Sequence, residues 1–147
     1  MPINASKVVV GGLAAGLVNN VLGFVIQGML LGKRMMDEMA AAAPTLADKG
    51  QDTKTIVCRV ITGFAIGILI TWLYAAMRPR FGPGPKTAFL AGFAVWLCGF
   101  IFYMDWLYVG MMSPGLYAIV SVAMLVNCSI VGLVGGMIYK EDAAQTG

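Results

Sequence analysis

Long apolar segments separated by short polar ones make up most of the chain. These segments lie at about residues 7–31, 56–77, 87–109 and 114–139. Each is close to the roughly 20 residues that an α-helix needs to cross the ~30 Å hydrocarbon layer of a bilayer. Because a backbone in lipid must satisfy its own hydrogen bonds, each segment is expected to be a transmembrane helix. The pattern predicts an all-α protein, with residues 1–147 forming one domain of four transmembrane helices in an antiparallel up-down bundle.

Prolines mark several helix ends. Ser113 followed by Pro114 predicts a helix start, since serine caps free N–H groups and proline loses no hydrogen bond at the first helical position. Arg78 is expected to end the second helix, because the residue before a proline is disfavoured in the α region. The proline-rich run from 79 to 85 then predicts a tight, non-helical turn between the second and third helices.

The first helix is expected to extend beyond the membrane as far as residue 43. Residues 33–43 are mostly good helix formers, and Pro44 ends the run. Lys33 with Asp37 and Arg34 with Glu38 have the i,i+4 spacing of helical ion pairs. Three methionines would form an apolar patch on this extension: Met35, Met36 and Met39. The patch is interpreted as a contact with lipid or with the chain's own helices, or alternatively as a docking surface for a partner protein.

Composition and charge support a membrane location. Charged residues make up 12% of the chain, against roughly 25% in a soluble domain. The 10 Lys and Arg residues flank the apolar segments, so we interpret them as anchors at the membrane interface and expect no nucleic-acid partner. They divide evenly between the two ends of the bundle. The short, cation-rich loop at residues 78–86 favours cytoplasmic termini.

The most specific pattern is a stripe of glycines and amides along the first helix. At the helical repeat, its members share an arc of about 100°. They are Gly12, Gly16, Asn19, Asn20, Gly23 and Gln27. Glycines let another backbone approach closely, and amides hydrogen-bond across such a contact. The stripe therefore predicts helix packing, within the chain or with a partner. The alternative is that the three amides line a path for a small molecule or an ion.

Similar small-residue pairs occur on the second and fourth helices. They are Gly63 with Gly67 and Gly132 with Gly136. Asn127 lies off the stripe of its helix and is expected to make a different contact, with the outside of the bundle as one candidate.

Arg59 and Asp105 are the charged residues closest to the apolar zone, near helix ends on the same predicted side of the membrane. An interfacial ion pair or separate snorkelling to the interface is the simplest interpretation, and a proton- or substrate-coupled role is the alternative. No charge lies near the middle of a predicted helix, which disfavours an ion-coupled pump.

The available side chains argue against catalysis. The chain has no histidine, which is the commonest catalytic base and metal ligand. It also has no nucleophile triad, metalloprotease motif or phosphate-binding loop. Cys58, Cys98 and Cys128 lack CxxC spacing and are interpreted as small buried hydrophobic residues, with a disulfide or metal cluster as the alternative. We expect no enzyme activity, no catalytic residues, no metal site and no cofactor of its own. Bound lipid is compatible with the sequence, whereas a quinone or pigment contact is less favoured.

Two stretches resemble uncharacterised four-helix integral proteins of the bacterial inner membrane. They are VNNVLGF at 18–24, leading to LGK at 31–33, and LYAAMRPRFGPGP at 73–85. Together they cover less than half of the chain, and neither is a motif of known chemistry. The resemblance implies a four-helix fold in the bacterial cytoplasmic membrane, and it implies no activity.

These features together predict a non-catalytic accessory or structural subunit. It would pack through its glycine-rich helix faces against the other subunits of a larger membrane complex, of respiratory or photosynthetic type. The alternative is a small transporter, or a membrane protein that binds lipid or another small molecule through Asn19, Asn20 and Gln27.

Overall fold

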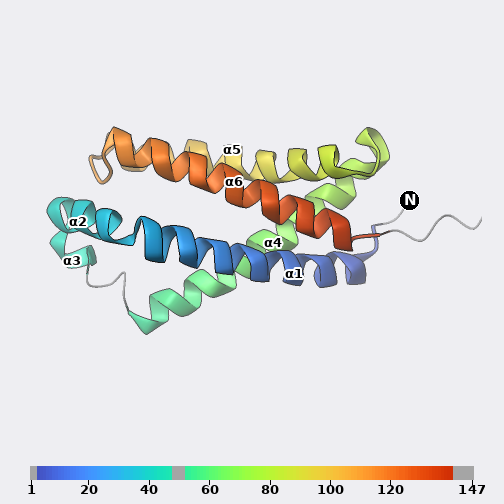
Figure 1. The fold of residues 1–147 in the computed structure, drawn as a ribbon, viewed down its shortest axis with the longest axis horizontal. Helices are drawn as coiled ribbons and strands as arrows, with labels where there is room; N and C mark the ends of the chain where they lie inside the picture. The colour runs from blue at the N-terminus through green and yellow to red at the C-terminus, as the bar shows by residue number, and fades with distance from the viewer. Residues whose placement is uncertain (1–2, 48–51, 141–147) are drawn as a thin grey trace, which may run out of the picture.

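The computed structural model describes residues 3–47 and 52–140, and within these ranges the regular structure is entirely helical (Figure 1). The helices are α1 at Ala5–Gly23, the π-helical segment η1 at Phe24–Leu30, α2 at Gly32–Ala42, α3 at Pro44–Ala47, α4 at Thr53–Phe81, α5 at Pro85–Tyr108 and α6 at Pro114–Ile138. The long helices run in alternating directions along the chain (Figure 1). The predicted all-α fold is therefore confirmed, and the alternating helix directions agree with the up-down arrangement that the sequence predicts.

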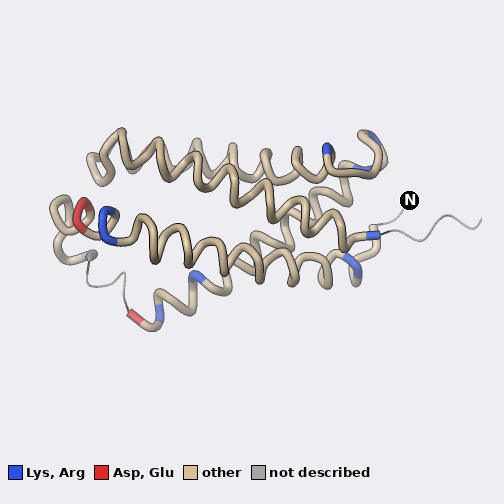
Figure 2. The backbone as a smooth tube through the Cα atoms, in the orientation of Figure 1, with Lys and Arg blue, Asp and Glu red and all other residues tan. Residues whose placement is uncertain are grey.

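Four stretches of the described chain are long and apolar enough to cross a membrane, namely α1 with η1, α4, α5 and α6. Most Lys, Arg, Asp and Glu residues lie towards the two ends of the bundle, and one cation on the diverging start of α4 lies further in (Figure 2). This distribution fits helices whose middle lies in hydrocarbon and whose ends reach the polar interface. The chain is a helical membrane protein.

One close contact between helices joins α1 and α4. A Cβ atom added to Gly67 would overlap the backbone of Gly16, and one added to Gly12 or Gly16 would collide with the backbone of α4 at Ile68 or Phe64. Without side chains in the way, the two backbones approach closely, and dispersion contacts between them replace contacts with lipid. This crossing is the most extensive contact between elements in the fold.

The second close contact joins α5 and α6. Gly92 lies against the carbonyl of Cys128, and Gly132 lies against the carbonyl of Ala88. Gly135 packs on Thr71 of α4, so α6 also touches the α1–α4 pair. The glycine stripes predicted on separate helices thus meet one another inside a single chain.

The predicted end of the second helix at Arg78 is wrong. The helix α4 continues through Pro79 to Phe81, and Gly82, with a φ of 81°, closes its last turn. The N–H of Gly82 donates to the carbonyl of Arg78 at 2.9 Å. A glycine in the left-handed region is a common way to end a helix, and Pro79, which cannot donate a backbone hydrogen bond, lies within the last turn of α4.

The predicted extension of the first helix to residue 43 is helical but interrupted. The chain leaves α1 through the π-helical η1, where Leu31 donates to the carbonyl of Ile26 at 2.9 Å. A separate helix, α2, then covers Gly32–Ala42. The stretch that connects the first and second spans is short, because α3 reaches Ala47 and α4 begins at Thr53. The rest of that stretch, residues 48–51, lies outside the described residues.

The first third of α4 diverges from the bundle, and its contact with α1 begins near Val60, whose carbonyl accepts from Asn20. Residues 53–62 are all exposed, apart from the half-buried Thr55. Figure 1 shows the start of α4 well apart from α5 and α6, with the helix approaching α1 only further along its length. Burial begins at Gly63, where the glycine contact with α1 starts. The bundle is therefore tight at one end of α4 and open at the other.

We expect Gly67→Ala to lower the stability of the protein by about 1–3 kcal/mol, because the added methyl group forces α1 and α4 apart. Gly99→Ala is the matched control, since a Cβ at this position of α5 meets no atom within 4 Å. The control should unfold at the same temperature as the natural protein or slightly above it. Thermal unfolding in detergent, followed by circular dichroism, measures both. Equal melting temperatures for the two variants would contradict this account of the helix crossing.

Candidate functional site

Two asparagines meet near the middle of the bundle and link three helices. The side-chain amide of Asn127, on α6, donates to Asn19 Oδ1, on α1, at 2.8 Å. The amide of Asn19 donates in turn to the carbonyl of Gly63, on α4, at 3.2 Å. Asn127 is 2% exposed and Asn19 is 8% exposed. We call these two residues the central amide pair.

One atom of the central amide pair has no hydrogen bond. Asn127 Oδ1 is the only buried side-chain oxygen without a partner among the residues that the structure describes. An unsatisfied amide group costs free energy in an apolar setting. The pair is also neutral and has no group that titrates near neutral pH. It is suited to aligning helices and unsuited to proton transfer.

The other two amides of the predicted stripe contact different neighbours. Asn20 donates to the carbonyls of Gly16 at 3.0 Å and Val60 at 3.2 Å. Gln27 donates to the sulfur of Met124, on α6, at 3.6 Å. Together with the central amide pair, these bonds direct Asn19, Asn20 and Gln27 to separate contacts between helices, and they do not converge on one point.

Most of the glycines predicted to form an interface face other helices of this chain. They are Gly12, Gly16, Gly63, Gly67, Gly132 and Gly136. Gly23 is different, because a Cβ at that position would meet no atom within 4 Å. The predicted packing surface is therefore used mainly inside the bundle, and Gly23 lies outside it.

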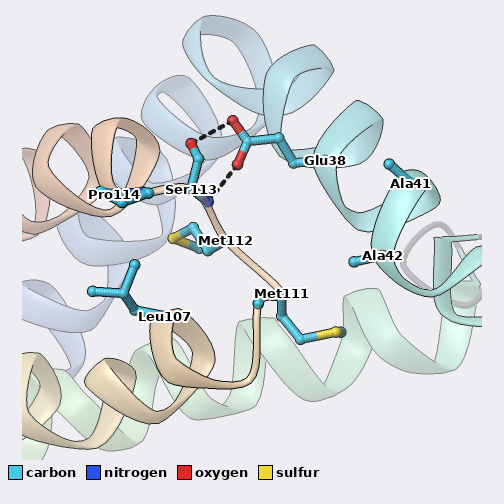
Figure 3. A pocket seen from close by; sticks show the side chains of 9 residues that line it. Glu38, Ala41, Ala42, Leu107, Met111, Met112, Ser113 and Pro114 are labelled. Atoms are coloured by element: carbon cyan, nitrogen blue, oxygen red, sulfur yellow. Dashed lines mark hydrogen bonds between the residues drawn. The ribbon is translucent and has the colours of Figure 1, made fainter.

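A carboxylate fastens α2 to the start of α6 (Figure 3). Glu38 Oε2 accepts from the backbone N–H of Ser113 at 2.8 Å, and Glu38 Oε1 accepts from the Ser113 hydroxyl at 2.9 Å. Ser113 also caps α6, as predicted, by accepting from the N–H of Leu116 at 3.3 Å. The expected i,i+4 pair of Arg34 and Glu38 forms at 3.2 Å. We call the contact between Glu38 and Ser113 the Glu38 latch.

The electrostatics of the Glu38 latch favour the ionised carboxylate. The backbone N–H of Ser113 is the largest cause that holds the pKa of Glu38 below its ordinary value of 4.5, and the Ser113 hydroxyl and Arg34 act in the same direction. Partial burial opposes them. A negative charge at the N-terminus of α6 also interacts favourably with the helix dipole.

The predicted methionine patch lies beside this latch. Met35, Met36 and Met39 are all half-buried, and Met35 packs against the cluster that contains Met112 and Leu116. An open pocket of about 650 Å³ lies between α2 and the turn from α5 to α6 (Figure 3). It is lined by Glu38, Ala41, Ala42, Leu107, Gly110, Met111, Met112, Ser113 and Pro114. Met35 therefore contacts the chain's own helices.

The structure does not bring Arg59 and Asp105 together. Both are exposed, and the one ion pair recorded among the described residues joins Arg34 and Glu38. The physical reason is that Arg59 belongs to the exposed first third of α4, the part of the helix that lies apart from α5 and α6 (Figure 1). Arg78 has aromatic neighbours instead: its guanidinium carbon lies 5.9 Å from the ring centre of Tyr74 and 5.6 Å from that of Tyr139.

Little in the described chain offers further chemistry. Across residues 3–47 and 52–140, no group of three His, Cys, Asp or Glu residues is placed to hold a metal ion. The three cysteines are free thiols, and Cys58 and Cys98 are exposed, so only Cys128 fits the expected burial. Comparisons with protein-family models, with curated proteins and with solved structures find no match to this chain. The fold and the polar contacts together define a four-span helical membrane protein.

Two features of the site escape sequence reasoning. Asn127 is buried and pairs with Asn19, so placing it outside the bundle is wrong. Its partner lies 108 residues away in the chain, and the contact requires both helices to pack on α4. The Glu38 latch likewise joins residues separated by 75 positions. The only sequence signal for it is the serine–proline start of α6.

We expect Asn19→Leu to destabilise the protein by about 1–2 kcal/mol, because it leaves Asn127 with no hydrogen-bond partner. Asn127→Leu should lower the free energy of unfolding by less than Asn19→Leu does, since it also removes the unpaired Asn127 Oδ1. A double-mutant cycle of unfolding in detergent should give a coupling energy of about 0.6–1.7 kcal/mol. A second cycle with Asn20 and Asn127 is the control and should be additive. If both cycles are additive, the hydrogen bond between Asn19 and Asn127 contributes no coupling energy to the stability of the protein.

The Glu38 latch should open in acid. Glu38 lies outside the membrane-spanning segments, and its pKa is lowered in the folded protein. Its stabilising contribution is therefore complete above the ordinary value of 4.5 and is lost as the pH falls through the lowered pKa. Spin labels at positions 40 and 108 should give a narrow distance distribution at pH 7 that broadens as the pH is lowered progressively below 4.5. In the Glu38→Gln variant, the distance distribution between the spin labels should be broad at both high and low pH. A narrow distribution for Glu38→Gln at pH 7 would exclude the latch.

Proposed function

We propose that this protein is a non-catalytic subunit of a larger membrane assembly and that the diverging start of α4 packs against a transmembrane helix of another subunit. The observation that carries the proposal is the exposure of residues 53–62 around nearly the whole circumference of the helix. Helices of a membrane bundle normally expose only their outward face to lipid. A segment that is also exposed on its inward face is suited to a neighbour that its own chain does not supply.

The inward face of this segment can be identified from the helical repeat. Ile56 and Arg59 precede Gly63 by seven and four residues, so they lie on the face of α4 that packs on α1 further along. Ile56 is nonetheless 48% exposed, and Arg59 is exposed. This face combines an apolar surface with one cation, which fits a partner helix that carries an acidic or other hydrogen-bond-accepting group.

The polar groups inside the bundle support a structural role. The central amide pair and Asn20 bond to one another or to backbone carbonyls on neighbouring helices. Such contacts stabilise helix association. The glycine contacts do the same, so the chain can act as a compact unit that presents α4 to a partner.

Photo-cross-linking tests this proposal in the native membrane. A benzophenone amino acid at position 56 should capture a defined protein partner. The matched control is position 119 on the outer face of α6, because Ile119 is 45% exposed and Ile56 is 48% exposed. The control should yield lipid adducts alone. The mass of the complex extracted in mild detergent should exceed that of one chain.

A single chain in the extract, with lipid adducts at both positions, would overturn the proposal. That result would favour the alternative in which the protein binds or moves a small apolar solute by itself. A cross-link at position 56 that joins two copies of this chain would likewise replace the assembly with a homo-oligomer.

A further inference from the structure

Thioether side chains gather at the end of the bundle where α2 meets the turn from α5 to α6. Met112, in the turn, is 8% exposed and belongs to a buried cluster with Leu116 and Tyr117. Met35 of α2 and Met104 of α5 pack against the same cluster. We call Met35, Met104 and Met112 the methionine cluster.

We propose that the methionine cluster is a binding site for a soft monovalent metal ion, Cu(I). Thioether sulfur is a soft ligand that selects Cu(I) over hard cations such as Mg²⁺ or Ca²⁺. Met104 and Met112 come from the end of α5 and the turn that follows it, whereas Met35 comes from α2, which is far away in the sequence, so the docking of α2 completes the proposed site. A neutral donor set also suits a monovalent ion at the edge of the membrane, because the bound complex carries only one positive charge.

The neighbouring pocket provides a route to the cluster. Met112 lines both the buried cluster and the open pocket of about 650 Å³, so one side chain connects the two. Met111 and the carboxylate of Glu38 line the same pocket. Figure 3 shows the sulfurs of Met111 and Met112 pointing in opposite directions, with Met112 towards Leu107 and Pro114. A carboxylate and a second thioether therefore line the same open pocket from which Met112 is reached.

The Glu38 latch adds a positional constraint. Met35 precedes Glu38 by three residues on α2, so both lie on the same side of that helix. The hydrogen bonds from Ser113 to Glu38 hold this side of α2 against the turn that carries Met112. If the methionine cluster served only to fill space, leucine at the same positions would pack equally well. If it binds an ion, leucine removes the sulfur ligands, so substitution by leucine distinguishes the two roles.

The test uses Ag(I), a redox-stable ion with the same preference for sulfur, and the full chain in detergent. The starting protein carries Cys58→Ser and Cys98→Ser, because these exposed thiols would also bind the ion. The test variant adds Met35→Leu, Met104→Leu and Met112→Leu, which nearly conserve volume. The control adds Met29→Leu, Met77→Leu and Met137→Leu instead, and so removes three thioethers outside the cluster.

Isothermal titration should give one Ag(I) per chain for the starting protein and for the control. The test variant should bind at least about tenfold more weakly. Met35→Leu alone is the second variant, in case the triple variant loses its helical circular dichroism spectrum, and it should weaken binding in the same direction. Equal affinities for the test and control variants would overturn the site, as would the absence of saturable binding to the starting protein. The outcome is independent of whether α4 has a protein partner.

Discussion

The close approach of α1 and α4 is the constraint on which the rest of the structure depends. Lipid is as apolar as leucine, so burial of apolar side chains gives transmembrane helices little reason to associate. Gly16 and Gly67 provide a different driving force, because their backbones touch directly. This crossing also brings the Gly63 carbonyl within reach of Asn19. A bulkier side chain at the crossing would therefore disturb the amide contact together with the packing.

The central amide pair converts that two-helix contact into a three-helix one. Asn19 donates to α4 and accepts from α6, so a single side chain fixes the relative positions of both neighbours of α1. Glycine contacts tolerate some sliding along the helix axes, whereas a hydrogen bond of 2.8 Å does not. The unpaired Asn127 Oδ1 is the cost of this arrangement. Register and rotation of the bundle thus come from a polar contact, and its compactness comes from glycine.

The sequence was sufficient for what depends on local composition. The apolar lengths predicted the four spans, Ser113 predicted the start of α6, and the spacing of Arg34 and Glu38 predicted their ion pair. The prediction from the sequence failed at the end of α4. Pro79 alone predicts that the helix ends at Arg78, but the helix continues to Phe81 because Gly82 completes its last turn. The sequence could not identify the partner of Asn127, because a helical wheel gives the direction of a side chain relative to its own helix only. Which helix lies in that direction is decided by the whole bundle.

Different interactions stabilise the tightly packed part of the bundle and its open end. This difference explains why the open end is suited to binding a partner. Around Gly67 the helices touch through backbone atoms, which leaves no room for a side chain at the crossing. At the opposite end, α4 diverges from the bundle, and α2 is held at the turn from α5 to α6 by the Glu38 latch and by flexible methionine side chains. Methionine adapts its shape at little cost, and a half-buried carboxylate contact near the end of the bundle can exchange partners with water. A protein that must keep its fold while it accepts a neighbour benefits from this division, because the adaptable end can change without disturbing the contact between α1 and α4.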